Sequence, residues 1–142
     1  MRAIDTIVLV RALTGDDADQ SARAVALIGT HPIFIPVTVV LELEWVLRSR
    51  YAFAPKVVAQ AIEKIAALAN VVLGERQAVV AAAAKAAQGW DFADALHHAL
   101  SHGCDDFVTL DADLARRAAR SATGGAKLEP VVTKLGSLTA AP

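Results

Sequence analysis

Four acidic residues stand within or directly after apolar stretches of this sequence, and their types allow metal-ion chemistry: Asp5, Glu42, Asp94 and Asp111. A carboxylate is costly to bury unless something pairs with it or coordinates it. Four carboxylates in one place need a cation, and hard oxygen ligands that leave room for water suit Mg²⁺ or Mn²⁺. With one or two such ions, a site of this kind can position a water molecule and stabilise the leaving oxygen in phosphodiester hydrolysis.

Each acid also has a purely structural explanation. Asp91 can cap a helix, with Asp94 in its first turn, and Asp111 can cap the helix that it precedes. Glu42 can be a solvated residue on the edge of an amphipathic helix, whereas Asp5 is harder to explain because it stands between two apolar runs of the sequence. The four together favour a shared site, because two follow strands and two lie in the first turns of helices. These positions meet at the carboxyl edge of a parallel sheet.

Patterns typical of strands and helices alternate along the chain, with turn residues between them. Strands are expected at 3–4, 33–35, 71–73, 107–110 and 128–132, and helices at 6–14, 16–29, 37–50, 55–69, 75–88, 91–102 and 111–121. Connections of this length allow parallel pairing with right-handed crossovers. We therefore predict an α/β fold, a three-layer α/β/α domain with a mainly parallel central sheet of four to five strands.

Length and composition narrow the class of protein further. The 142 residues predict one domain over 1–135, followed by a flexible tail over 136–142. The net charge of −1 excludes a general basic shell for nucleic acid, so a polyanion must be bound by local arginine clusters. The single cysteine, Cys104, excludes an internal disulfide and suits a reducing compartment, so we expect a cytoplasmic protein. We expect no membrane span, since charges interrupt the apolar runs, and no secretory leader.

Several common catalytic motifs are absent from the sequence. It contains no G-x-S-x-G elbow, no P-loop and no G-x-G-x-x-G fingerprint, and no arrangement of Cys and His that suggests zinc. His97 and His98 follow Asp94 at helical spacing, but a surface or core-edge role is the favoured interpretation. The acids are thus the principal candidates for chemistry.

Four segments, in order, resemble the PIN-domain ribonucleases, and more closely the VapC-type toxins of type II toxin–antitoxin pairs. These segments are 2–11, 35–48, 91–97 and 108–111. The resemblance implies an endoribonuclease dependent on Mg²⁺ or Mn²⁺, with Asp91 and Asp113 as auxiliary acids beside the four named above. It also implies a homodimer and a small VapB-like cognate antitoxin that binds over the active-site groove.

This hypothesis assigns a role to each candidate residue. Asp5, Asp94 and Asp111 would hold the metal, and Glu42 would be a further ligand or would orient the attacking water. The candidate contacts to RNA phosphates are Arg11, Arg48, Arg116 and Arg117. One departure from the family pattern is Ile7, where a polar residue, most often Asn, is usual. Ile7 cannot donate or accept a hydrogen bond through its side chain, so reduced metal affinity or activity is expected.

Two other functions remain open from the sequence. Ile7 motivates the first, a catalytically weakened, metal-poor binding module that keeps the fold and the partner surface. The second is a phosphatase resembling the haloacid-dehalogenase family, because Asp111 and Asp113 form a D-x-D motif after an apolar strand. Against the phosphatase, this motif normally opens the chain, and little sequence follows it here.

Overall fold

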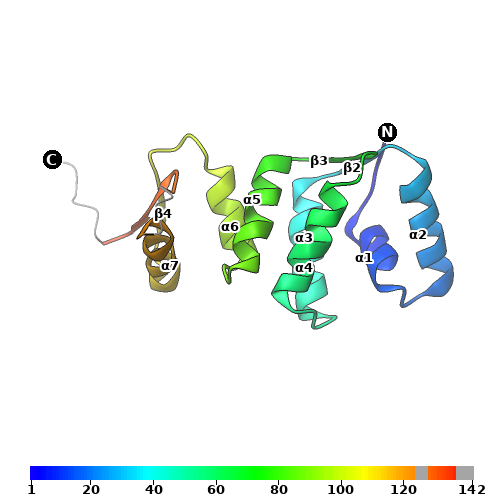
Figure 1. The fold of residues 1–142 in the computed structure, drawn as a ribbon, viewed down its shortest axis with the longest axis horizontal. Coiled ribbons are helices and arrows are strands. Elements are labelled where there is room, and N and C mark those ends of the chain that lie inside the picture. Colours follow the sequence, from blue (N-terminus) through cyan, green and yellow to red (C-terminus); the bar gives the residue numbers. More distant parts are fainter. Residues whose placement is uncertain (124–127, 137–142) are drawn as a thin grey trace.

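A computed structural model describes residues 1–123 and 128–136 of the chain (Figure 1). In these residues the strands are β1 (Arg2–Ala3), β2 (Ile33–Ile35), β3 (Val71–Leu73), β4 (Asp106–Thr109) and β5 (Val131–Lys134). The helices are α1 (Thr6–Thr14), α2 (Ala18–Thr30), α3 (Val37–Ser49), α4 (Pro55–Ala66), α5 (Arg76–Ala87), α6 (Phe92–Leu100) and α7 (Ala112–Thr123). Every expected element is present, with ends that differ by a few residues. Most of the expected tail, residues 137–142, lies outside the described residues.

All strand pairs are parallel, which confirms the predicted α/β class. The strands do not form one sheet, however. β1, β2 and β3 form a three-stranded sheet in that order, and β4 pairs only with β5 in a second sheet. β2 is the central strand of the larger sheet, and both Ile33 and Ile35 are fully buried there. Arg2 and Ala3 of β1 are both exposed, as expected for a short strand at a sheet edge.

The helices pack in sequence order along the molecule. α1 contacts α2 and α3, α4 contacts α5, and α5 contacts α6. The Ala-rich helix α5 fits between its neighbours because Ala82 and Ala83 are small enough to be completely buried in the core. At the turn after β3, Gly74 allows a close approach of the chain, because a Cβ there would lie 3.2 Å from the backbone nitrogen of Val37.

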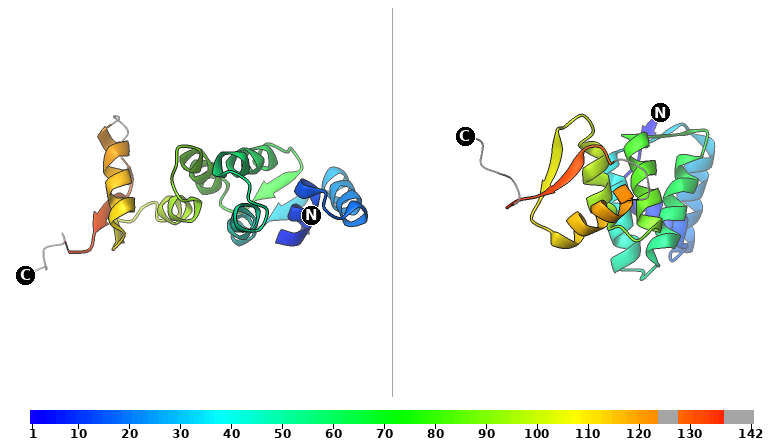
Figure 2. Two further views of the ribbon diagram at one scale, coloured as in Figure 1. Left: turned by 90° about the horizontal axis from the view of Figure 1, so that it is seen from below. Right: turned by 60° about the vertical axis from the view of Figure 1, so that its left-hand side comes forward.

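We call β4, α7 and β5, residues 106–123 and 128–136, the C-terminal unit. It lies at the opposite end of the molecule from β1 and α2, and Figure 2 shows it attached beside α6. Leu114 and Ala118 of α7 are buried, and Phe107 and Val132 pack against the same core. Within the described parts of the chain, no helix is long and apolar enough to cross a membrane.

Candidate active site

Asp94 lies in the first turn of α6, beside a small cavity. The preceding Asp91 caps this helix, and its Oδ1 accepts a hydrogen bond of 3.0 Å from the N–H of Asp94. Trp90 and Phe92, on either side of Asp91, are buried and hold the start of the helix in the core. Burial raises the pKa of Asp94, and the carboxylates of Asp91 and Asp111 raise it further. Carboxylates crowded in this way are stabilised by a bound cation.

Asp111 reaches the same cavity from the C-terminal unit. Its Oδ1 accepts hydrogen bonds from the N–H of Asp113, at 2.8 Å, and of Leu114, at 3.1 Å, so it caps α7. Asp111 thus caps the helix that it precedes, as the sequence suggested, and it also lies at the same cavity as Asp94. The cavity has a volume of about 160 Å³ and is lined by Trp90, Asp91, Asp94, Asp111, Asp113, Leu114 and Arg117.

Asp5 and Glu42 are the second pair, related through Thr6 near the end of β1. Asp5 caps α1, and its Oδ1 accepts a hydrogen bond of 3.3 Å from the N–H of Val8. The buried Thr6 directs its hydroxyl to Glu42 on α3 and donates a hydrogen bond to Oε2. Sequence reasoning missed Thr6. The only signal for it was a hydroxyl residue directly after the strand acid.

The structure therefore assembles the four predicted acids as two separate pairs. The cavity lined by Asp94 and Asp111 has neither Asp5 nor Glu42 in its lining. The charges that act on Asp94 come from Asp91, Asp111, His97 and Arg117, and not from Asp5 or Glu42. The expectation that all four meet in one crevice required β4 to lie in the same sheet as β1, and it does not.

The chemistry of these side chains fits a hard divalent cation. Asp94 and Asp111 would hold such an ion, since both offer carboxylate oxygens at one cavity. Within the described residues of a single chain, however, no three His, Cys, Asp or Glu side chains come together in a way that could hold a metal. A complete ligand set thus needs Asp5 and Glu42 to approach this pair.

Of the predicted phosphate-binding arginines, Arg117 lies closest to the acids. It lines the cavity of Asp94 and Asp111, and its charge acts on Asp94. It also lines an adjoining cavity of about 360 Å³. Arg116 pairs instead with the exposed Asp113 on the same helix.

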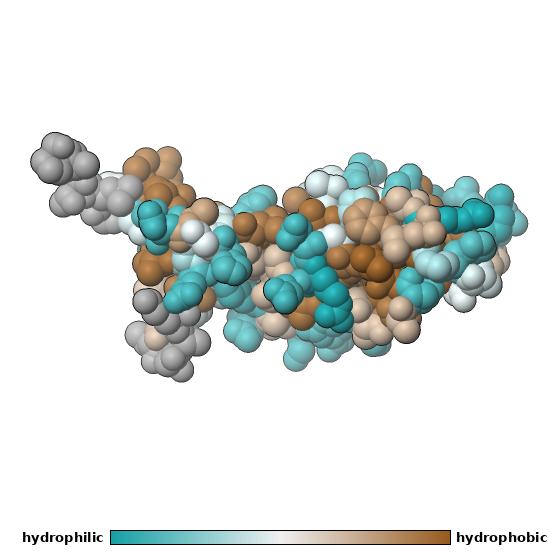
Figure 3. Space-filling model, turned by 90° about the horizontal axis from the view of Figure 1, so that it is seen from above, coloured by the Kyte–Doolittle hydropathy of each residue, from teal (hydrophilic) through white to brown (hydrophobic). Residues whose placement is uncertain are grey.

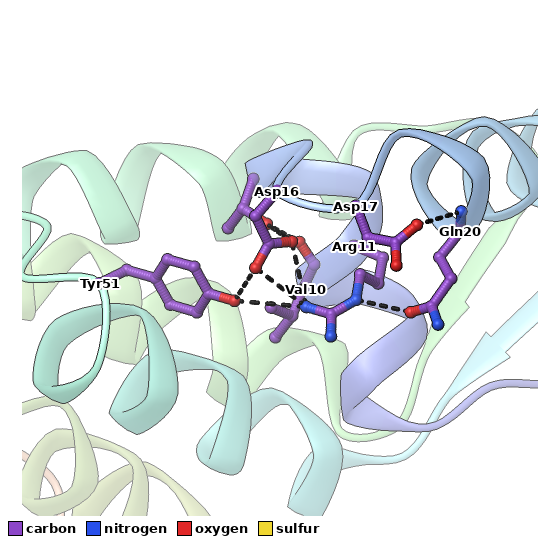
Figure 4. Close-up of polar contacts among 7 residues, drawn as sticks. Val10, Arg11, Asp16, Asp17, Gln20 and Tyr51 are labelled. Carbon is purple, nitrogen blue, oxygen red and sulfur yellow. Dashed lines mark hydrogen bonds and ion pairs between the residues drawn. The ribbon is translucent and has the colours of Figure 1, made fainter.

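The other two predicted arginines are held by carboxylates. Arg48 Nε donates to the buried Glu44 at 2.8 Å, and this hydrogen bond and charge raise the pKa of Arg48. Arg11 Nη1 lies 3.0 Å from Asp16 Oδ1, and the hydroxyl of Tyr51 donates to Oδ2 of the same carboxylate at 2.6 Å (Figure 4). The hydrogen bond from Tyr51 is the main cause of the lowered pKa of Asp16. Arg48 therefore pairs within its own helix, whereas Arg11 joins α1 to the segment before α2 and to Tyr51.

A buried histidine connects α6 to the C-terminal unit. His98 is only 2% exposed; its Nε2 lies 2.7 Å from the carbonyl oxygen of Pro130, and its Nδ1 lies 3.1 Å from Nζ of Lys85. Since Lys85 can only donate, Nδ1 accepts and Nε2 carries the proton. Burial lowers the pKa of His98, and it also lowers the pKa of Lys85. His98 is thus a fully buried residue with two polar partners, and not the surface or core-edge histidine that the sequence suggested.

Comparison with known proteins identifies the family. A family model described as PIN domain matches residues 3–120. No curated protein and no solved structure matches the chain. PIN domains are generally metal-dependent nucleases, and the acids described above suit that chemistry. Because the match covers more than half of the sequence, the chain belongs to the PIN-domain family.

Proposed function

We propose that this protein is a metal-dependent endoribonuclease that acts as the toxin of a toxin–antitoxin pair. The observation that carries the proposal is the crowding of Asp94 by the carboxylates of Asp91 and Asp111, with Arg117 at the same cavity. A structural cap needs one carboxylate, whereas this cavity collects four beside a single cation. That arrangement favours Mg²⁺ or Mn²⁺ between the acids and a phosphate against the arginine.

The residues of this chain take distinct parts in hydrolysis. Asp94 and Asp111 would hold a divalent cation, which would supply a water of lowered pKa and positive charge against the phosphate. Arg117 orients the phosphodiester by hydrogen bonds to its oxygens. Glu42, held by the hydroxyl of Thr6, orients the attacking water or accepts its proton. Asp5 completes the ligand set.

The test is cleavage of labelled single-stranded RNA by the purified protein with Mg²⁺, with Mn²⁺ and with a chelator. We expect cleavage that needs the cation and falls at least ~100-fold in Asp94→Asn, because even indirect supports of a metal site are worth ~10–100-fold. Asp19→Asn is the matched control, since Asp19 is an exposed helix acid paired with Arg23 far from the cavity. Equal cleavage by both variants, or none by the wild type, would contradict the proposal.

A groove between α1 and α2 offers a binding site for the antitoxin of this proposal. Ile7, Val8 and Leu27 line a groove of about 410 Å³ between α1 and α2, together with Arg11, Gln20, Arg23 and Ala24. Its position next to Asp5 would let a bound peptide cover the start of α1. Co-expression with a small reading frame encoded next to this chain, where the genome has one, should give a complex that does not cleave RNA, and Ile7→Asp should weaken that complex.

A second candidate is the binding module without catalysis. One observation favours it, which is that a single copy does not bring Asp5 and Glu42 to the other pair of acids. Calorimetric titration with Mn²⁺ separates the two candidates, since tight binding that Asp94→Asn abolishes excludes the binding module. The phosphatase loses support, because the chain belongs to the PIN-domain family.

A further inference from the structure

Among the described residues, β1 and β4 each lie at an edge of their sheet and have one side without a partner strand, as β3 and β5 do at the opposite edges. On β1, the N–H of Arg2 donates to Pro32 at 2.8 Å and that of Ile4 donates to Phe34 at 3.2 Å, so both groups face β2. Peptide groups alternate along a strand, so those of Ala3 face the open side. β4 is paired with β5 on one side alone. An unpaired edge is a template for another strand.

Apolar side chains lie exposed beside both open edges. Val108 in β4 is 45% exposed, and Leu110 just after the strand is 75% exposed. Beside β1, Met1 and Ile7 are exposed. Figure 3 shows apolar surface on the C-terminal unit, and also over the middle of the molecule. Contact between the two edges would remove the apolar side chains beside them from water.

The chain does not bring its own two edges together. β1 and β4 lie at opposite ends of the molecule, with α5 and α6 between them, and the views of Figures 1 and 2 agree on this. The acids are divided in the same way. Asp5 and Glu42 lie at the β1 end, whereas Asp94 and Asp111 lie at the β4 end.

We propose that a second copy of this chain adds its β4 edge to the open edge of β1, so that each active site is shared between two copies. One copy supplies Asp5 and Glu42, and the other supplies Asp94 and Asp111. A two-fold pair fills both edges reciprocally and leaves neither open. Aligning Asp5 with Asp111 of the other copy places Arg2 beside Val108 of that copy and gives parallel strands throughout. That the four acids form one shared active site rests on the proposed nuclease function. The pairing of β4 with β1 does not depend on that function.

Cross-linking tests the pairing without any need for activity. In a Cys104→Ser background, a tagged chain with Ala3→Cys is mixed with an untagged chain with Val108→Cys and treated with a short bismaleimide. We expect a cross-linked species that contains one tagged and one untagged chain. The matched control replaces Val108→Cys by Val72→Cys, an exposed residue of β3, and should give no such species. Absence of the cross-link overturns the proposal. So does a chain carrying both cysteines that links only within itself, because its own β4 then fills the edge.

Complementation tests the sharing of the site. A mixture of Asp5→Asn and Asp111→Asn chains should recover about one quarter of wild-type cleavage, because half of the pairs are mixed and each mixed pair holds one intact site. Asp94→Asn with Asp111→Asn is the control, and it should recover nothing, since both acids come from the same copy. Recovery in neither mixture, beside an active wild type, overturns the sharing alone. If the wild type cleaves no RNA, the nuclease function fails and the cross-link still decides the pairing.

Discussion

His98 Nε2 donates a hydrogen bond of 2.7 Å to the carbonyl oxygen of Pro130, and this contact holds the C-terminal unit against α6. The other ring nitrogen accepts from Lys85, so one side chain satisfies two partners that are far apart in the sequence. Phe107 of β4 packs edge-on against the same ring, with centroids 5.9 Å apart. The position of Asp111 beside Asp94 therefore depends on a residue outside the cavity.

Replacing His98 by leucine should destabilise the protein. The carbonyl of Pro130 and the ammonium of Lys85 would lose their partner, and an unsatisfied buried polar group costs about 1–3 kcal/mol. We expect His98→Leu to lower the free energy of unfolding in urea by this amount, while His102→Leu, at an exposed position, leaves it nearly unchanged. Equal stability of the two variants would show that the contact does not hold the C-terminal unit.

The buried histidine should also make stability depend on pH. The folded-state pKa of His98 lies below its ordinary value of 6.5, mainly through burial. Below about pH 6.5 the unfolded chain binds a proton that the folded chain does not, so stability falls as the pH decreases through that window. Urea unfolding from about pH 8 to about pH 5 should show this loss, and His98→Gln should flatten the slope. If His98→Gln shows the same dependence of unfolding free energy on pH, other titrating groups cause that dependence.

The sequence predicted most of the fold because local patterns determine most of it. Apolar periodicity and turn residues located each strand and helix, and the four acids were found at strand ends and helix starts. The division into two sheets could not be predicted, since no local pattern tells whether β4 pairs with β1 of its own chain.

Partners of side chains were the other limit of sequence reasoning. Arg11 and Arg48 were predicted to contact phosphates, but Asp16, Tyr51 and Glu44 hold them in the fold. Spacing suggests the Glu44–Arg48 pair, four residues apart on α3, whereas the contact of Arg11 with Tyr51 joins residues 40 positions apart. Such long-range contacts follow from tertiary packing and leave no local signal.

Removing the charge of Asp94 should stabilise the protein in the absence of metal. In the folded protein, burial and two neighbouring carboxylates raise the pKa of Asp94 above its ordinary value of 3.8. At neutral pH, Asp94 is therefore ionised at a cost in folding stability that the unfolded chain does not have. Asp94→Asn should therefore raise Tm, by ~2–4 °C for each kcal/mol relieved. Added Mn²⁺ should raise Tm of the wild type and not of the variant. A lower Tm for Asp94→Asn in a chelator would refute this electrostatic explanation.

Thr6 should affect catalysis through Glu42, because its buried hydroxyl is the donor that holds that carboxylate. Thr6→Val keeps the shape and removes the donor, so we expect kcat for RNA to fall ~10–100-fold with KM little changed, as for other residues that orient an active-site group. Thr6→Ser restores the hydroxyl and should recover most of the activity. Thr30→Val is the control, since that hydroxyl donates to the carbonyl of Ala26 at the exposed end of α2. A Thr6→Val enzyme with normal kcat would leave Glu42 without a role in orienting water, whereas a rise in KM alone would place Thr6 in RNA binding.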